Sequence, residues 1–142
     1  MKITKVEPVF VAVPYEHGAP KPMRSGVGSW DTQDILFVRV ETDAGVVGWG
    51  EAFSNSSTPV TIPAIAKVVA PLAEGRDPRD IDQLIRELTR RTQSIARSGP
   101  VQFALSGLDI ALWDIRGKLA GEPVWKLLGG AGKDSLEAYR SE

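Results

Sequence analysis

The sequence has 142 residues, of which 42% are hydrophobic and 25% charged, and its formal net charge is −1. These values are ordinary for one soluble domain, and they exclude the concentrated positive charge that a nucleic-acid partner or a polybasic membrane patch requires. The absence of cysteine excludes disulfides, thiol catalysis and cysteine-bound zinc. With no signal peptide pattern and no apolar run near the ~20 residues of a membrane helix, we predict a cytoplasmic protein without a membrane partner.

A strand and a long loop open the chain. Residues 2–14 alternate loosely and are rich in β-branched side chains, which predicts a strand that Pro14 ends. Residues 14–31 are rich in proline and glycine and contain few large apolar groups, so they predict a long loop. Loops of this length are usually functional or disordered.

A hairpin and a second loop follow. Ile35–Thr42 and Val46–Ala52 have strand patterns, and Asp43-Ala44-Gly45 between them is typical of a tight turn. The polar residues 53–58 predict a second loop. Together with the first strand, this hairpin predicts a small three-stranded antiparallel sheet.

Helical patterns begin at about residue 60. Apolar residues recur at near-helical spacing over 60–73, and we expect Pro71 to end or bend that helix. Asp77-Pro78 predicts an N-cap followed by proline at the first helical position. The next helix carries apolar residues at i, i+3, i+4 and i+7, namely Ile81, Leu84, Ile85 and Leu88.

The longest predicted helix runs from about Val101 to Leu119. It is apolar over more than half of its circumference, so we expect another layer on each of two sides. Gly107 inside it costs ~1 kcal/mol relative to alanine, which indicates that another element approaches closely. Gly121 is placed to end the helix, and a short helix is expected over Pro123–Leu128. The final residues, Leu136–Ser141, resemble the start of a strand.

Strands followed by helices predict an α+β fold, a three-stranded antiparallel sheet followed by a helical bundle. No reaction centre is evident within the chain. Its Asp and Glu residues are dispersed, whereas Mg²⁺ needs several carboxylates that converge. His17 is the single histidine, and catalysis, substrate contact and a solvated loop position all stay open for it. For Glu51 and Asp114 we expect a role as hydrogen-bond acceptors.

Three segments resemble one family. They are the hairpin Ile35–Ala52, the tetrapeptide Gly75-Arg76-Asp77-Pro78, and the run Ala104–Lys118 followed by Gly121–Gly130. In this order they are similar to the N-terminal capping domain of the mandelate racemase/muconate lactonizing branch of the enolase superfamily. The resemblance implies an enolase N-terminal-like cap at residues 1–130. It also implies a linker and the first strand of a missing (β/α)₈ barrel at residues 131–142.

By this resemblance, the chain is the substrate-capping part of an enzyme that removes the proton α to a carboxylate. The reaction would be that of a racemase, epimerase or acid-sugar dehydratase, with Mg²⁺ bound by the missing barrel domain. The implied partners are a small carboxylic acid, the chain's own or a partner's barrel, and further copies in a homo-oligomer. Neither catalytic nor metal-binding residues are expected in this chain. The alternative is a stand-alone, non-catalytic module that binds or dimerises through the long helix.

The resemblance also assigns candidate substrate-binding residues. Loops of the family that close over the substrate correspond to residues 15–31 and 53–58. The first loop contributes Met23, Val27 and Trp30, at positions where relatives point side chains at the substrate, and His17, Lys21 and Arg24, which suit hydroxyl groups or a distal carboxylate. The second loop contributes Phe53, Ser54 and Asn55. The mixture of polar and apolar groups favours a polar substrate such as a sugar acid.

Overall fold

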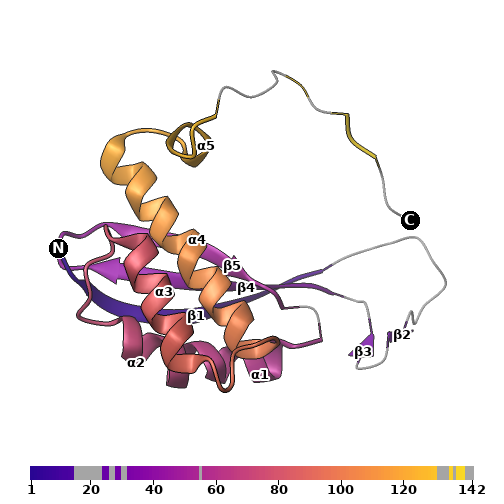
Figure 1. Ribbon diagram of the computed structural model, residues 1–142. Helices are drawn as coiled ribbons and strands as arrows, with labels where there is room; N and C mark the ends of the chain where they lie inside the picture. Colours follow the sequence, from indigo (N-terminus) through magenta and orange to yellow (C-terminus); the bar gives the residue numbers. More distant parts are fainter. Residues whose placement is uncertain are drawn as a thin grey trace.

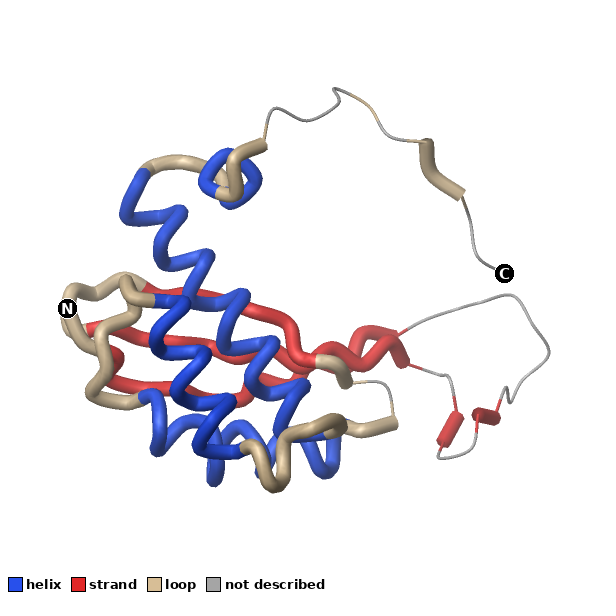
Figure 2. Tube along the Cα trace, viewed as in Figure 1, coloured by secondary structure: helices blue, strands red, loops and turns tan. Residues whose placement is uncertain are grey.

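The computed structural model describes residues 1–14, 24–25, 28–29, 32–54, 56–130, 135 and 137–139, with only the backbone described at 24–25 and 28–29. Its core is one antiparallel sheet with helices packed on one face (Figures 1 and 2). Across the described residues, no helix is long and apolar enough to cross a membrane.

Three strands form the main sheet in the order β1-β4-β5, as predicted: β1 (Ile3–Pro14), β4 (Thr32–Thr42) and β5 (Val47–Ala52). The β4–β5 turn places Gly45 at φ 77°, a conformation that glycine adopts without a steric penalty. The predicted long loop between β1 and β4 contains a further pair of two-residue strands, β2 (Arg24–Ser25) and β3 (Gly28–Ser29). Strands this short leave no alternation in the sequence, so the pattern did not reveal them.

The inner face of the sheet packs on helix α4 (Pro100–Ala120). Alternate residues of β4 point toward the helices, and Leu36, Val38 and Val40 are fully buried. Glycine allows the close contact. A Cβ atom at Gly50 would lie 2.1 Å from the Gly107 carbonyl oxygen, and one at Gly107 would lie 2.6 Å from Val38 Cγ2. The close approach predicted from Gly107 is therefore confirmed.

The sheet covers α4 on one side only. The helix contacts β4 and β5 there and packs against η1 and α3, but Arg116, half a turn around the helix from the sheet-facing Gly107, is exposed. The expectation of a layer on each of two sides is thus not met within the described residues. The pattern was right about the amount of apolar surface, but a helix pattern does not say which part of the protein covers it.

The predicted helix over residues 60–73 has three segments: α1 (Thr58–Pro63), the π-helix η1 (Ala64–Val69) and α2 (Ala70–Ala73). The Ala70 N–H donates to the Ile65 carbonyl oxygen, one residue further back than in an α-helix. This shift occurs between Pro63 and Pro71, neither of which has an N–H to donate. Pro71 lies in the first turn of α2, so it accompanies a change of helical register rather than ending the helix.

The N-cap predicted at Asp77 is wrong, because helix α3 (Ile81–Thr92) begins later and is capped by Asp80. The Asp80 carboxylate accepts a hydrogen bond from the Gln83 N–H at 3.4 Å. Asp77 instead accepts from the backbone N–H and side chain of Arg79. Two aspartates close together both suit a cap, and the turn at residues 77–79 selects the second one.

The C-terminal part follows the sequence expectations closely as far as residue 130. Helix α4 ends at Gly121 with φ 65°, and the short helix α5 (Val124–Leu127) follows. Residues 137–139 are not in a strand, and the rest of the predicted barrel strand at 136–141 lies outside the described residues. A strand needs a neighbour for its hydrogen bonds, so this element stays a prediction.

Candidate functional site

Both predicted substrate loops leave the same end of the main sheet. In the ladder, Pro14 at the end of β1 pairs with Thr32 at the start of β4, and Ala52 at the end of β5 pairs with Leu36. The first loop joins β1 to β4, and the second joins β5 to α1. The sheet topology thus brings the ends of two segments, separated in sequence by about 20 residues, to the same end of the sheet.

Most of the candidate substrate-binding residues lie outside the described residues: His17, Lys21, Met23, Val27, Trp30 and Asn55. The backbone of Arg24 lies in β2, paired with Ser29, and its side chain is not described. The two remaining candidates, Phe53 and Ser54, are described in full and differ sharply in their surroundings.

Phe53 presents an exposed aromatic ring at this end of the sheet. Its side chain is 55% exposed, and its ring packs on Phe103 of α4 with 4.8 Å between the ring centroids and 49° between the planes. A tilted pair at this distance is a favourable aromatic contact. Phe53 therefore has one face held by α4 and substantial surface open to a ligand.

Ser54 is buried, with 5% of its surface exposed. Its hydroxyl donates to the Asp34 carbonyl oxygen at 2.8 Å, which ties the second loop to the first residues of β4. Close by, the Thr32 hydroxyl donates to the Asp34 carboxylate at 2.8 Å. This contact gives Ser54 a structural function at the root of both loops, and a direct contact with substrate stays a prediction.

The turn after Ser54 is closed by further hydrogen bonds. The Ser54 carbonyl oxygen accepts from the Ser57 N–H at 2.7 Å and from the Thr58 hydroxyl at 3.1 Å. The Ser57 hydroxyl also donates to the Phe53 carbonyl oxygen at 3.1 Å, and the Thr61 hydroxyl donates to the Ser57 carbonyl oxygen at 3.0 Å. The sequence analysis missed Phe103, Thr58 and Thr61. The serine and threonine run before Pro59 was an available signal, because these residues favour turns and helix starts.

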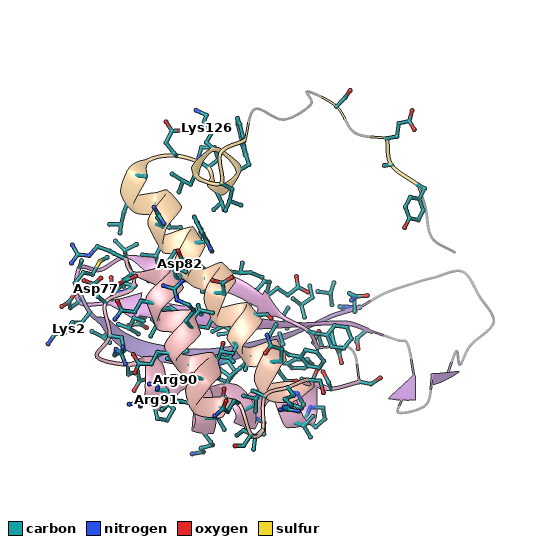
Figure 3. The ribbon with its side chains drawn as sticks, in the orientation of Figure 1. Lys2, Asp77, Asp82, Arg90, Arg91 and Lys126 are labelled. Atoms are coloured by element: carbon teal, nitrogen blue, oxygen red, sulfur yellow. The ribbon has the colours of Figure 1, made fainter. Side chains whose placement is uncertain are left out.

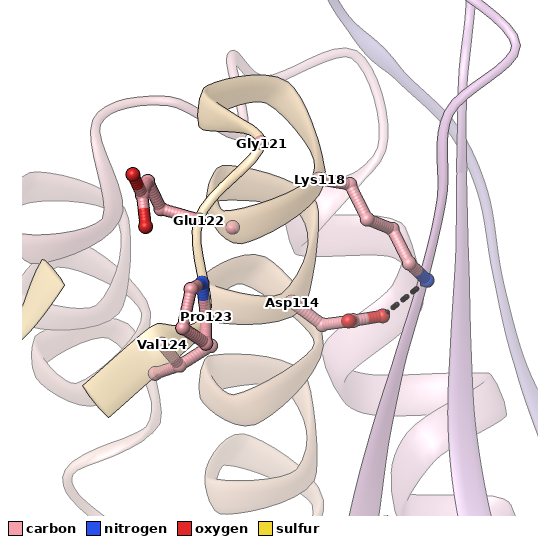
Figure 4. A pocket seen from close by; sticks show the side chains of 7 residues that line it. Asp114, Lys118, Gly121, Glu122, Pro123 and Val124 are labelled. Carbon is pink, nitrogen blue, oxygen red and sulfur yellow. Dashed lines mark hydrogen bonds and ion pairs between the residues drawn. The ribbon is translucent and has the colours of Figure 1, made fainter. Parts of the chain in front are cut away.

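At the edge strand β5, Asp114 acts as a backbone acceptor, as expected. Its carboxylate accepts from the Trp49 N–H at 2.9 Å and pairs with Lys118, whose ammonium group donates to the Val47 carbonyl oxygen at 2.8 Å. Both contacts satisfy backbone groups on the outer side of the edge strand β5, which protects that edge from pairing with another chain. Figure 4 shows the pair beside a shallow hollow, where each charge is already neutralised by the other.

One other carboxylate stands out. Partial burial and the nearby Asp82 charge raise the pKa of Asp109 on α4 above its usual value. Asp82, labelled in Figure 3, lies on α3, which packs beside α4. Two carboxylates alone do not hold a divalent cation well. Across the described ranges, no three His, Cys, Asp or Glu side chains are grouped to bind a metal, so those residues do not fit a Mg²⁺ centre.

At this end of the sheet the described residues form a turn closed by hydrogen bonds, with an exposed aromatic side chain, near the strand ends from which both predicted loops begin.

Comparison with known proteins gives one consistent result. Residues 8–129 match the sequence model of a family described as the mandelate racemase / muconate lactonizing enzyme, N-terminal domain. A D-galactonate dehydratase family member from Catenulispora acidiphila is 44% identical over 119 residues, which cover 82% of this chain. The match covers only 27% of that relative, so this chain spans about a quarter of its length.

Solved structures give the same result for the fold. The 3,6-anhydro-D-galactonate cycloisomerase from Zobellia galactanivorans superposes with a TM-score of 0.73 at 35% identity, over 92% of this chain and 32% of that one. A mandelate racemase/muconate lactonizing protein from Paracoccus denitrificans, complexed with magnesium, gives 0.72 at 35% identity, over 93% and 31%.

Proposed function

This chain belongs to the mandelate racemase / muconate lactonizing enzyme family of the enolase superfamily, and we propose that it is the substrate-capping part of a Mg²⁺-dependent enzyme. That enzyme would remove the proton α to the carboxylate of a small acid, as a racemase, an epimerase or an acid-sugar dehydratase. The observation that carries the proposal is the match over residues 8–129 to the N-terminal domain of this family.

The chemistry would come from a part of the protein that this chain does not include. Enzymes of this superfamily use a lysine or histidine base together with one or two Mg²⁺ ions. The described residues fit no such metal centre. We therefore assign Mg²⁺ and the bases to a barrel corresponding to the remaining length of the relatives, and we assign closure and selection of the substrate to this chain.

The apolar surface at the end of α4 and around α5 is the surface that we assign to the barrel. Leu119 near the end of α4 is 48% exposed, and Trp125 and Leu128 at the following short helix are 55% and 65% exposed. These apolar groups lie on and beside α5, and the relative from Catenulispora acidiphila is about four times as long as the part that this chain matches. An apolar surface of this kind is typical of an interface between domains.

For the substrate, we propose an acid sugar. The relatives named above include a D-galactonate dehydratase family member and a 3,6-anhydro-D-galactonate cycloisomerase. Polar side chains such as His17, Lys21 and Arg24 in the first loop suit hydroxyl groups, and Phe53 offers an apolar surface for the carbon chain. A cytoplasmic location and a homo-oligomer remain parts of this proposal.

The test uses the longer protein that the proposal requires, incubated with sugar acids in deuterated water. We expect Mg²⁺-dependent exchange of the α-proton or loss of water, followed by proton NMR, and no reaction after treatment with EDTA. Retention of the α-proton in every acid, together with absence of Mg²⁺ binding, would contradict the proposal.

The isolated 142-residue chain separates the proposal from the alternative of a stand-alone module. Calorimetry should show no tight Mg²⁺ binding by this chain, and tight stoichiometric binding would place the metal site within it. Sedimentation provides the second measurement. A module that functions alone should form a defined dimer, which the addition of a separately produced barrel domain does not dissociate.

A further inference from the structure

The turn between β5 and α1 is held by hydrogen bonds at Ser54 and at Ser57. We propose that Ser54 is a positioning residue, which locks this turn to the start of β4 and thereby presents Phe53 as a fixed wall of the substrate site. The role of Phe53 as a wall rests on the proposed function. The lock itself rests only on contacts within the chain.

The lock acts through both polar groups of Ser54. The hydroxyl reaches across to the Asp34 carbonyl oxygen, 20 residues away in sequence, and the side chain is 5% exposed, so water competes little for this bond. The carbonyl oxygen accepts the Ser57 N–H and the Thr58 hydroxyl. One residue therefore joins the start of β4, the turn and the start of α1.

The backbone of the turn includes one unusual conformation. Ser56 adopts φ 33°, in the left-handed region that non-glycine residues rarely occupy. Such a conformation persists where the surrounding structure determines it. The hydrogen bonds of Ser57 with Phe53 and Ser54 contribute to that determination, because they join residues that flank Ser56 in the sequence.

Phe53 is fixed as a result. Its carbonyl oxygen accepts from the Ser57 hydroxyl, its neighbour Ser54 is tied to β4, and its ring packs on Phe103. The exposed part of the ring is thus pre-organised, and a substrate that contacts it does not have to order it first. Because Asp34 lies two residues after the start of β4, where the first loop ends, the lock also connects the roots of both loops.

The first experiment measures amide hydrogen exchange in the 142-residue chain. Thr92→Ala is the matched control, because Thr92 is 3% exposed and donates its hydroxyl to the Leu88 carbonyl oxygen at 2.8 Å, at the end of α3. Loss of the hydroxyl in Ser54→Ala should speed exchange of the Ser57 amide roughly five- to tenfold, with little change at that amide in the control. Ser54→Cys, which keeps a similar volume but donates weakly, should act in the same direction if the alanine variant folds poorly.

The second experiment measures kinetics in the longer protein. Ser54→Ala should raise KM for the preferred acid several-fold with little change in kcat, and its effect should be non-additive with that of Phe103→Ala, because both act through Phe53. Equal rates of hydrogen exchange at the Ser57 amide in Ser54→Ala and Thr92→Ala would overturn the proposal that Ser54 holds the turn to β4. Additive effects of Ser54→Ala and Phe103→Ala on KM would overturn the proposal that Phe53 forms a fixed wall of the substrate site. Absence of turnover by the unsubstituted protein would instead contradict the proposed function, while the exchange result still decides the lock.

Discussion

Replacement of Gly50 by alanine tests the closest contact in the fold. Gly50 lies on the inner face of β5, against α4. A Cβ atom there would lie 2.1 Å from the Gly107 carbonyl oxygen and 2.6 Å from the Ala111 backbone nitrogen. Both neighbours are backbone atoms of one helix, so no side-chain rotation can relieve the overlap.

The size of the effect follows from the distance that α4 would have to move. Ordinary contacts of a Cβ atom begin at 3.4 Å, so the helix and strand would have to separate by about 1.3 Å. This separation would loosen fully buried side chains such as Leu108 and Leu112, which lose dispersion contacts when a gap opens. Overpacking usually costs about 1–3 kcal/mol, and we expect Gly50→Ala to lower the free energy of unfolding by about 3 kcal/mol or more.

The assay is urea denaturation followed by circular dichroism, with a thermal melt that should show a loss of about 10 °C. Glu51→Ala is the matched control, because Glu51 is the next residue of β5 and is exposed on the outer face, where a substitution should change stability by less than about 0.5 kcal/mol. A loss below about 1 kcal/mol in Gly50→Ala would refute the close packing of α4 on β5.

Four further predictions test other parts of the fold. Gly107→Ala should cost less than Gly50→Ala, because the added methyl group meets the Val38 side chain, and combining it with Val38→Ala should recover about 1 kcal/mol in urea denaturation. Asp114→Ala should lower the free energy of unfolding by about 1 kcal/mol. It should also speed hydrogen exchange of the Trp49 amide, which donates a hydrogen bond to this carboxylate. The hydrogen bond from Arg76 lowers the pKa of Glu87 from 4.5 to about 2, so the stability that it adds is present above pH 4.5 and is lost as the pH falls. The difference in Tm between wild type and Glu87→Gln should therefore vanish below about pH 2. The pH dependence of stability at Asp109 has the opposite sign, because burial raises the pKa of this carboxyl. Asp109→Asn should raise Tm at pH 7, and the gain should disappear below pH 3.8, where the carboxyl is protonated in both states.

Most of the fold was predictable because local patterns and tertiary packing agree. The alternation in Ile35–Thr42 and the turn at Gly45 specify the hairpin without reference to other segments. The apolar surface of α4 required a packed neighbour, and Gly107 indicated how close that neighbour lies. The run of residues from Ala104 to Gly130 was sufficient to indicate the family, to which residues 8–129 match.

Only the tertiary structure decided which of several suitable residues takes each role. Asp77 and Asp80 both suit a helix cap, and the turn at residues 77–79 assigns that role to Asp80. Phe53 and Ser54 are adjacent in one polar loop, yet one is exposed and the other is buried against Asp34. A sequence specifies which residues can donate, accept or pack, because these are properties of each side chain. Their partners depend on distances between segments far apart in the chain, which the packing of the sheet and helices sets.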